Sequence, residues 1–149
     1  MRVREREPGD EAGVRAFLEA RGSLRVARLG RLEAPLAHPA LLAEEDGRLL
    51  GVLTYVPESH EVLTLHASER GRGVGTALIE AAAERLRRLW LITTNDNLDA
   101  LRFYQRRGFR LVSLRPGAVD AARRLKPSIP PAGAFGIPLR DELDLERQI

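Results

Sequence analysis

The glycine-rich stretch at residues 70–75, RGRGVG, lies between a predicted strand and a predicted helix. The first N–H groups of a helix have no partner within it and form the positive end of its dipole. Because glycine has no Cβ, the backbone of such a loop can approach an anion closely. The stretch therefore predicts a cradle for a phosphate or pyrophosphate group. The structural alternative is a tight turn from strand to helix.

Two common nucleotide-binding motifs do not fit this loop. The dinucleotide fingerprint G-x-G-x-x-G needs its third glycine one place later, and an acidic residue about 20 positions further on. In that region the chain reads LITTN at 91–95. The phosphate loop of nucleoside triphosphatases needs a lysine followed by Ser or Thr, but the only lysine is Lys126. Both classes of nucleotide site are excluded.

The composition excludes several other classes of protein. Without cysteine the chain has no disulfide scaffold and no thiolate metal site, and its three histidines are scattered. The hydrophobic fraction of 44% and the charged fraction of 30% are typical of a globular protein. No apolar run approaches the roughly 20 residues that span a bilayer. We therefore expect a cytoplasmic protein with a single domain over 1–149, binding neither metal nor membrane.

Arginine supplies almost all of the positive charge. Of the 24 Lys and Arg residues only Lys126 is a lysine, and the formal net charge is +3. Residues 84–126 hold eleven basic and four acidic residues, so the positive charge is concentrated there. Guanidinium groups suit phosphates, and codon usage in a GC-rich genome is the alternative explanation. An RNA-binding surface is disfavoured, because aromatic residues make up 5% of the chain and do not alternate with basic ones.

Hydrophobic periodicity predicts the elements that position the glycine-rich stretch. Asp46-Gly47 is the signal of a two-residue hairpin turn. Residues 24–35 predict a helix or a loop, because Gly30 and Pro35 interrupt them. In the strand at 61–67, alternation places Glu61, Leu63 and Leu65 on one face and sends His66 to the other. Strands are predicted at 1–6, 40–44, 49–56, 61–67, 89–94, 109–114 and 142–147, and helices after Asp10 and at 76–88, 98–107 and 118–125.

Two sequence patterns occur together on these elements. Arg70, Gly73 and Gly75 form R-x-x-G-x-G, and residues 97–109 form N-x-x-A-x-x-F-Y-x-x-x-G-F. Together they resemble the GCN5-related N-acetyltransferase (GNAT) superfamily over residues 41–114, about half of the chain. The first pattern is moderately specific. The pair, at this separation and on these elements, is highly specific.

The resemblance implies a fold and a reaction. The fold is α/β or α+β, with a mixed, mostly antiparallel sheet of about six to seven strands, flanked by helices and splayed at the cofactor slot. The reaction is direct transfer of the acetyl group of acetyl-CoA to a primary amine, of a small molecule or a protein, in a ternary complex. The alternative is a non-catalytic acetyl-CoA sensor. The positive stretch then surrounds a phosphate-rich cofactor rather than nucleic acid, and the family also allows a homodimer.

The resemblance also assigns roles to residues. Tyr104 matches the position that protonates the leaving thiolate, and the alternative is that it packs on the helix and hydrogen-bonds the cofactor sulfur. Asn97 caps the helix, bonds the pantetheine arm, or does both. The Leu65 N–H is expected to polarise the thioester carbonyl. The implied cofactor-binding residues are Leu65, His66, Ala67, Arg70, Gly71, Arg72, Gly73, Val74, Gly75, Thr76, Asn97, Ala100 and Tyr104.

The general base has no fixed motif. Glu61 is the first candidate, because family members often carry a carboxylate on this strand and it is expected to face the same way as Leu65. His66 titrates near neutral pH but is expected on the opposite face. A third alternative is that neither residue is the base.

The connection at about 115–140, before the last strand, is longer than in a minimal acetyltransferase. Connections of this length are usually functional or disordered. Its prolines stiffen it, and Arg123, Arg124 and Lys126 gather positive charge. We expect it to fold over the acceptor pocket and to select an anionic or polar acceptor. Alternatively, Asp141 and Glu142 meet a cationic amine.

Overall fold

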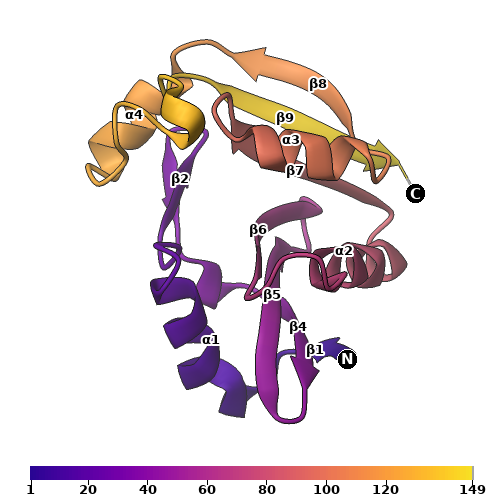
Figure 1. Ribbon diagram of the computed structural model, residues 1–149. Coiled ribbons are helices and arrows are strands. Elements are labelled where there is room, and N and C mark those ends of the chain that lie inside the picture. The colour runs from indigo at the N-terminus through magenta and orange to yellow at the C-terminus, as the bar shows by residue number, and fades with distance from the viewer. Residues whose placement is uncertain (149) are drawn as a thin grey trace. The chain divides into compact units, whose positions relative to one another are not determined.

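Four antiparallel strands form the sheet of the first part of the chain: β1 (Arg2–Glu5), β4 (Ala40–Glu45), β5 (Arg48–Val56) and β6 (Glu61–Ala67), in the order β1-β4-β5-β6. The computed structural model (Figure 1) describes residues 1–148. It divides into two compact units, residues 1–24 with 34–89, and residues 25–33 with 90–148. At the β4–β5 turn Asp46 and Gly47 both have positive φ, +51° and +75°, so the predicted hairpin turn is confirmed.

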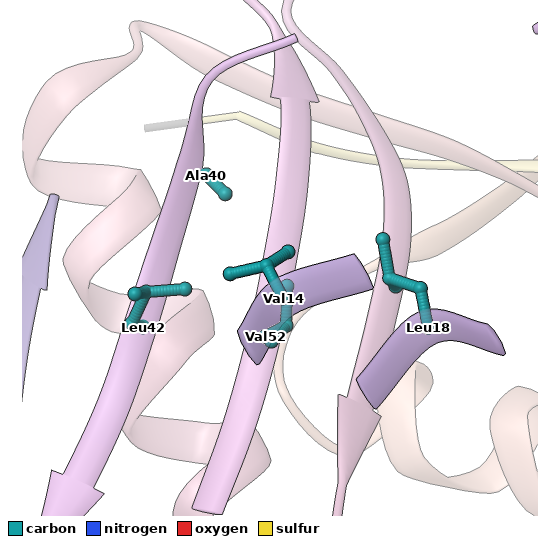
Figure 2. Close-up of a cluster of buried hydrophobic side chains, with 5 residues drawn as sticks. All are labelled: Val14, Leu18, Ala40, Leu42 and Val52. Carbon is teal, nitrogen blue, oxygen red and sulfur yellow. The ribbon is translucent and has the colours of Figure 1, made fainter. Parts of the chain in front are cut away.

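Helix α1 (Glu11–Glu19) covers one face of this sheet. Val14 and Leu18, four residues apart, point from α1 into a cluster with side chains of β4 and β5 (Figure 2). The strand residues lie on one face because Leu42 pairs with Val52 and Ala40 is two positions from Leu42. All five side chains are at most 2% exposed. The members of the cluster are Val14, Leu18, Ala40, Leu42 and Val52.

Helix α2 (Val74–Arg85) covers the opposite face. It approaches β5 at Gly51, the neighbour of Val52 in the chain and therefore on the other side of the sheet. A Cβ at position 51 would lie 2.5 Å from Cγ1 of Val74 and 3.0 Å from Cδ1 of Leu78. The absent side chain of Gly51 thus lets the first turn of α2 rest directly on the sheet.

The second unit has a three-stranded sheet in the order β7-β9-β8, in which β8 and β9 are antiparallel. Helix α3 follows β7, and α4 lies in the connection between β8 and β9. The bounds are β7 (Arg88–Thr94), α3 (Leu98–Gln105), β8 (Arg110–Arg115), α4 (Ala118–Leu125) and β9 (Glu142–Gln148). The described part of the chain also contains three short 3₁₀ helices, η1 (Pro8–Asp10), η2 (Pro35–Ala37) and η3 (Ala134–Gly136).

The prediction of a helix or loop at 24–35 is wrong. The segment forms a hairpin of β2 (Val26–Arg28) and β3 (Arg31–Glu33), which packs against α4. Leu29 and Gly30 at its turn have φ of +53° and +68°, the geometry of a type I′ turn. Gly30 is therefore the turn residue of a hairpin rather than an interruption. Leucine beside it gives no sequence signal, because a bulky residue rarely adopts positive φ.

The predicted fold class is confirmed: residues 1–148 form an α+β fold with seven mostly antiparallel sheet strands and four α-helices. The predicted helices and the remaining strands all form, with bounds that differ by up to three residues. The predicted connection before the last strand holds α4 and η3. None of the helices within residues 1–148 is long and apolar enough to cross a membrane.

The contact at Gly51 generates a prediction. Gly51→Ala places a methyl group against Val74 and Leu78, and this overpacking is expected to lower the free energy of unfolding by about 1–3 kcal/mol. Gly13→Ala is the matched control, because Gly13 is exposed in α1 and a Cβ there meets nothing within 4 Å. The control should be stabilised by about 0.5–1 kcal/mol. Urea denaturation measures both, and equal stabilities of the two variants would contradict the tight contact.

Candidate active site

Strand β6 contains a β-bulge at Leu63. Thr64 pairs with Thr54 of β5, but Val62 pairs with Tyr55, so Leu63 is the extra residue. A bulge re-aims the side chains on either side of it, because it breaks the period of two. No glycine or proline marks the position in the sequence, so nothing in the local pattern signals it.

The bulge overturns the predicted faces of β6. Glu61 pairs with Val56 and His66 with Val52, and these two β5 residues are four apart and share a face. Leu65 pairs with Leu53, on the other face. The prediction that Glu61 shares a face with Leu65 and that His66 lies opposite is therefore wrong, because it assumed unbroken alternation. Glu61 and His66 share the α1 face of the sheet.

Polar side chains line this face of β6. Glu61 is 2% exposed. The hydroxyls of Thr54 and Thr64 are hydrogen-bonded at 2.6 Å and both residues are buried. His66 is half-buried, and its Nε2 is 2.8 Å from the Ser23 hydroxyl. Buried polar groups are costly unless paired, so this row inside an otherwise apolar layer is a candidate for chemistry.

Burial lowers the pKa of His66, and the charge of Arg21 lowers it further. A neutral imidazole is therefore favoured near pH 7, which is the form that can accept a proton. Leu65 is half-buried on the α2 face and Ala67, the last residue of the strand, is exposed. In an antiparallel pair alternate amides point away from the partner strand, so β6 directs some of its amides away from β5.

The glycine-rich stretch forms the predicted turn into α2. Gly71 and Gly73 have φ of +78° and +75°, and a Cβ on either would meet nothing within 4 Å. The Ala77 N–H makes the first helical bond, to the Gly73 carbonyl at 3.0 Å. The N–H groups of the three residues before it, Val74 to Thr76, lie at the positive end of the α2 dipole. An open backbone turn followed by these donors fits an anionic group.

The Arg72 side chain has partners within its own unit. Its Nη2 is 2.6 Å from Oε2 of Glu45, at the end of β4, and its Nη1 is 3.6 Å from Glu69. The hydrogen bond from Arg72 lowers the pKa of the Glu45 carboxyl. Arg70 also makes a side-chain or backbone interaction. The contribution of the stretch to anion binding therefore rests on its backbone.

Helix α3 begins as predicted at Asn97, whose Oδ1 accepts a hydrogen bond from the Ala100 N–H at 3.2 Å. The capping role of Asn97 is confirmed. Tyr104 lies four residues after Ala100 and on the same side of the helix. Its ring contacts Phe103 and Phe109 edge-on, with centroids 5.1 and 5.3 Å away. The structure thus places these three predicted residues on one helix of the second unit.

Burial raises the pKa of the Tyr104 hydroxyl, so the phenol keeps its proton at neutral pH. Within residues 1–148 the structure gives this hydroxyl no hydrogen-bond partner. A protonated phenol with an unused donor can hydrogen-bond or protonate a leaving group. Within residues 1–148 no group of three or more His, Asp or Glu side chains is arranged to hold a metal ion.

The model of the acetyltransferase (GNAT) family matches residues 9–109. The chain belongs to this family. It is 41% identical over 115 residues to the uncharacterized protein YxbD of Bacillus subtilis, covering 72% of each chain. It is 33% identical over 87 residues to the peptidyl-lysine N-acetyltransferase YiaC of Escherichia coli, covering 52% of this chain and 59% of YiaC.

Solved structures of GNAT proteins share the fold. A GNAT acetyltransferase from Elizabethkingia anophelis with acetyl-CoA bound aligns with a TM-score of 0.68 at 16% identity, covering 99% of this chain and 97% of that one. The structure of yncA from Salmonella typhimurium with its cofactor acetyl-CoA also gives a TM-score of 0.68 at 16% identity, covering 99% of this chain and 93% of that one. At this identity the likeness concerns the fold alone.

The lowered pKa of His66 makes a prediction about stability. Below pH 6.5, the ordinary pKa of histidine, His66 of the unfolded chain takes up a proton that His66 of the folded chain resists. The contribution of His66 to the free energy of unfolding is therefore at its full value above about pH 6.5 and falls as the pH drops below it. The wild type should therefore lose more thermal stability than His66→Gln between pH 7.5 and pH 5.5. Melting curves at both pH values measure this. An undiminished pH dependence in His66→Gln would show that another group is responsible.

Proposed function

We propose that this GNAT protein transfers the acetyl group of acetyl-CoA to a primary amine, in a ternary complex. The observation that carries the proposal is the turn at Gly71 and Gly73, which leads into the N–H groups at the start of α2. Acetyl-CoA supplies an activated acetyl thioester and a pyrophosphate group. The N–H groups at the start of α2 suit that pyrophosphate, and two solved structures of the same fold carry acetyl-CoA.

The second unit contributes the proposed acid. Tyr104 is protonated at neutral pH, as a phenol with an ordinary pKa of about 10 already is, burial raises that pKa further, and the hydroxyl protonates the leaving thiolate. Asn97, which caps α3, also bonds the pantetheine arm. The family model runs from residue 9 in the first unit to residue 109 in the second, which supports a chain that functions as one acetyltransferase domain.

Proton removal from the attacking amine is assigned to the α1 face of β6. Glu61 remains the first candidate because its carboxylate attracts an ammonium group more strongly than a neutral imidazole does. His66 now shares its face, and the lowered pKa keeps its imidazole neutral. The amide of Leu65 polarises the thioester carbonyl. The acceptor is a primary amine of a small molecule or of a protein, and YiaC, which acts on peptidyl-lysine by its name, supports the second kind.

The role of Tyr104 is tested with the two tyrosines of the chain. Tyr104→Phe should lower kcat at least about 100-fold, because a general acid contributes a factor of about 100 or more. Stabilisation by CoA in a thermal melt should persist. Tyr55→Phe is the control, since the Tyr55 hydroxyl bonds Glu5 on the α2 face. Turnover is measured as free thiol released with a panel of primary amines. Full turnover by Tyr104→Phe would remove this residue from the mechanism.

The glycine-rich stretch is tested with two glycines of similar backbone. Gly73→Ala and Gly22→Ala both place a methyl group at positive φ, +75° and +67°, in open space. Each should lose about 1–2 kcal/mol of stability through strain. Only Gly73→Ala should lose most of the rise in melting temperature that CoA produces in the wild type. If the wild type shows no rise, the proposed function is wrong. If it binds CoA but acetylates no amine, the protein is an acetyl-CoA sensor.

A further inference from the structure

Phe135 is an exposed aromatic residue in a strained conformation. Its side chain is 69% exposed, more than any other large hydrophobic residue in the part of the chain that the structure describes. Its φ of +60° lies in the left-handed region, which costs a residue with a side chain about 1–2 kcal/mol. Because the ring is mostly exposed, it buries little apolar surface, and the hydrophobic effect does not offset this cost. Strain of this kind persists only where the surroundings impose it, and it clusters at ligand sites.

The surroundings of Phe135 are a tight hairpin. Ala132 and Pro138 form a β-bridge, the Gly133 N–H donates to the Ile137 carbonyl at 2.8 Å, and the Leu139 N–H donates to the Pro131 carbonyl at 3.0 Å. These bonds lie on both sides of the turn that carries Phe135 and hold it in place. The ring is therefore presented at the tip of a fixed hairpin.

Asp96 attaches this tip to the turn before α3. The Asp96 side chain is buried, accepts the Ala134 N–H at Oδ2 over 2.9 Å and accepts the Thr94 hydroxyl at Oδ1. A Cβ at position 133 would lie 2.0 Å from the same Oδ2, so only glycine allows this approach. The neighbour of Asp96 in the chain is Asn97, the cap of α3. Tyr104 follows within a helix of eight residues, about 12 Å long.

Several charged residues at and near the connection are already engaged. Arg123 donates to the backbone carbonyls of Ile129, Pro130 and Leu139, and Lys126 donates to that of Arg25. Asp141 accepts the Gly117 N–H. Glu142 is 2% exposed and is bonded to Arg115. These partners weigh against selection of a charged acceptor by those four residues, and Phe135 is the most exposed large hydrophobic side chain that the connection offers to a ligand.

We propose that Phe135 contacts the acceptor and selects amines that carry an apolar group, and that Asp96 is its positioning residue. This inference rests on the function proposed above and names the class of its acceptor. The ring would pack on the apolar part of the amine, which offsets the strain at position 135. Asp96 fixes the ring relative to α3 and hence to Tyr104.

The test compares phenethylamine with ethanolamine, titrated calorimetrically into the CoA-saturated protein. The wild type should bind phenethylamine at least about 10-fold more tightly, the range expected for an apolar group in a site. Phe135→Ala should lose that preference, and Leu111→Ala, at a residue of β8 that is 50% exposed, should keep it. A wild type without the preference, or a Phe135→Ala variant that retains it, overturns the inference.

Two Asp96 variants test the positioning role. Asp96→Ala loses the acceptor for the Ala134 N–H and should lose the preference, whereas Asp96→Asn keeps an oxygen there and should retain it. The ratio of the two affinities is the readout, because general destabilisation would not change it selectively. An Asp96→Ala variant with the wild-type ratio overturns this part. Acetylation is measured separately: a phenethylamine that binds without being acetylated contradicts the proposed function alone, and acetylation without the preference contradicts this inference alone.

Discussion

The contact between Gly51 and Val74 is the constraint on which the anion cradle depends. Because position 51 has no Cβ, the Val74 side chain is buried against β5 at 2% exposure. That burial fixes the first turn of α2, and the first turn fixes the direction of its N–H groups. The conformation of the glycine-rich stretch is then largely a consequence, since Gly73 must reach the start of α2 from the end of β6. A hydrophobic contact within the sheet layer thus determines where a polar ligand can bind.

Local chemistry made much of this fold predictable, and long-range register did not. Asp46-Gly47 marks its hairpin because both residues tolerate positive φ, and Asn97 marks a helix start because its side chain accepts an amide proton. The bulge at Leu63 depends on how β6 pairs with β5, and no residue type in β6 signals it. The bulge puts Glu61 and His66 on one face, where unbroken alternation predicts opposite faces. The β2–β3 hairpin is missed for a local reason, because Leu29 at its turn adopts a positive φ that a bulky residue rarely takes.

The arginine-rich stretch has a structural component. Arg115 makes a two-pronged contact with Asp144 and a further bond to Glu142. Arg123 spreads its donors over three carbonyls of an irregular segment. A guanidinium carries five donors in a rigid fork, so it can satisfy several backbone oxygens that a segment without regular structure leaves over. Part of the positive charge in residues 84–126 therefore serves the folding of the connection before β9, alongside any field it creates around a ligand.

The residues that hold the Phe135 hairpin in place and the residue that it displays can change independently in evolution. Gly133 holds the hairpin through its backbone N–H, whereas Asp96 and Arg123 hold it through side chains that bond backbone atoms of the connection. Position 135 lies outside this set, with most of its side chain exposed. Single-codon changes there can alter what the hairpin displays while the frame persists. A lineage of such proteins could diversify at this one position without rebuilding its scaffold.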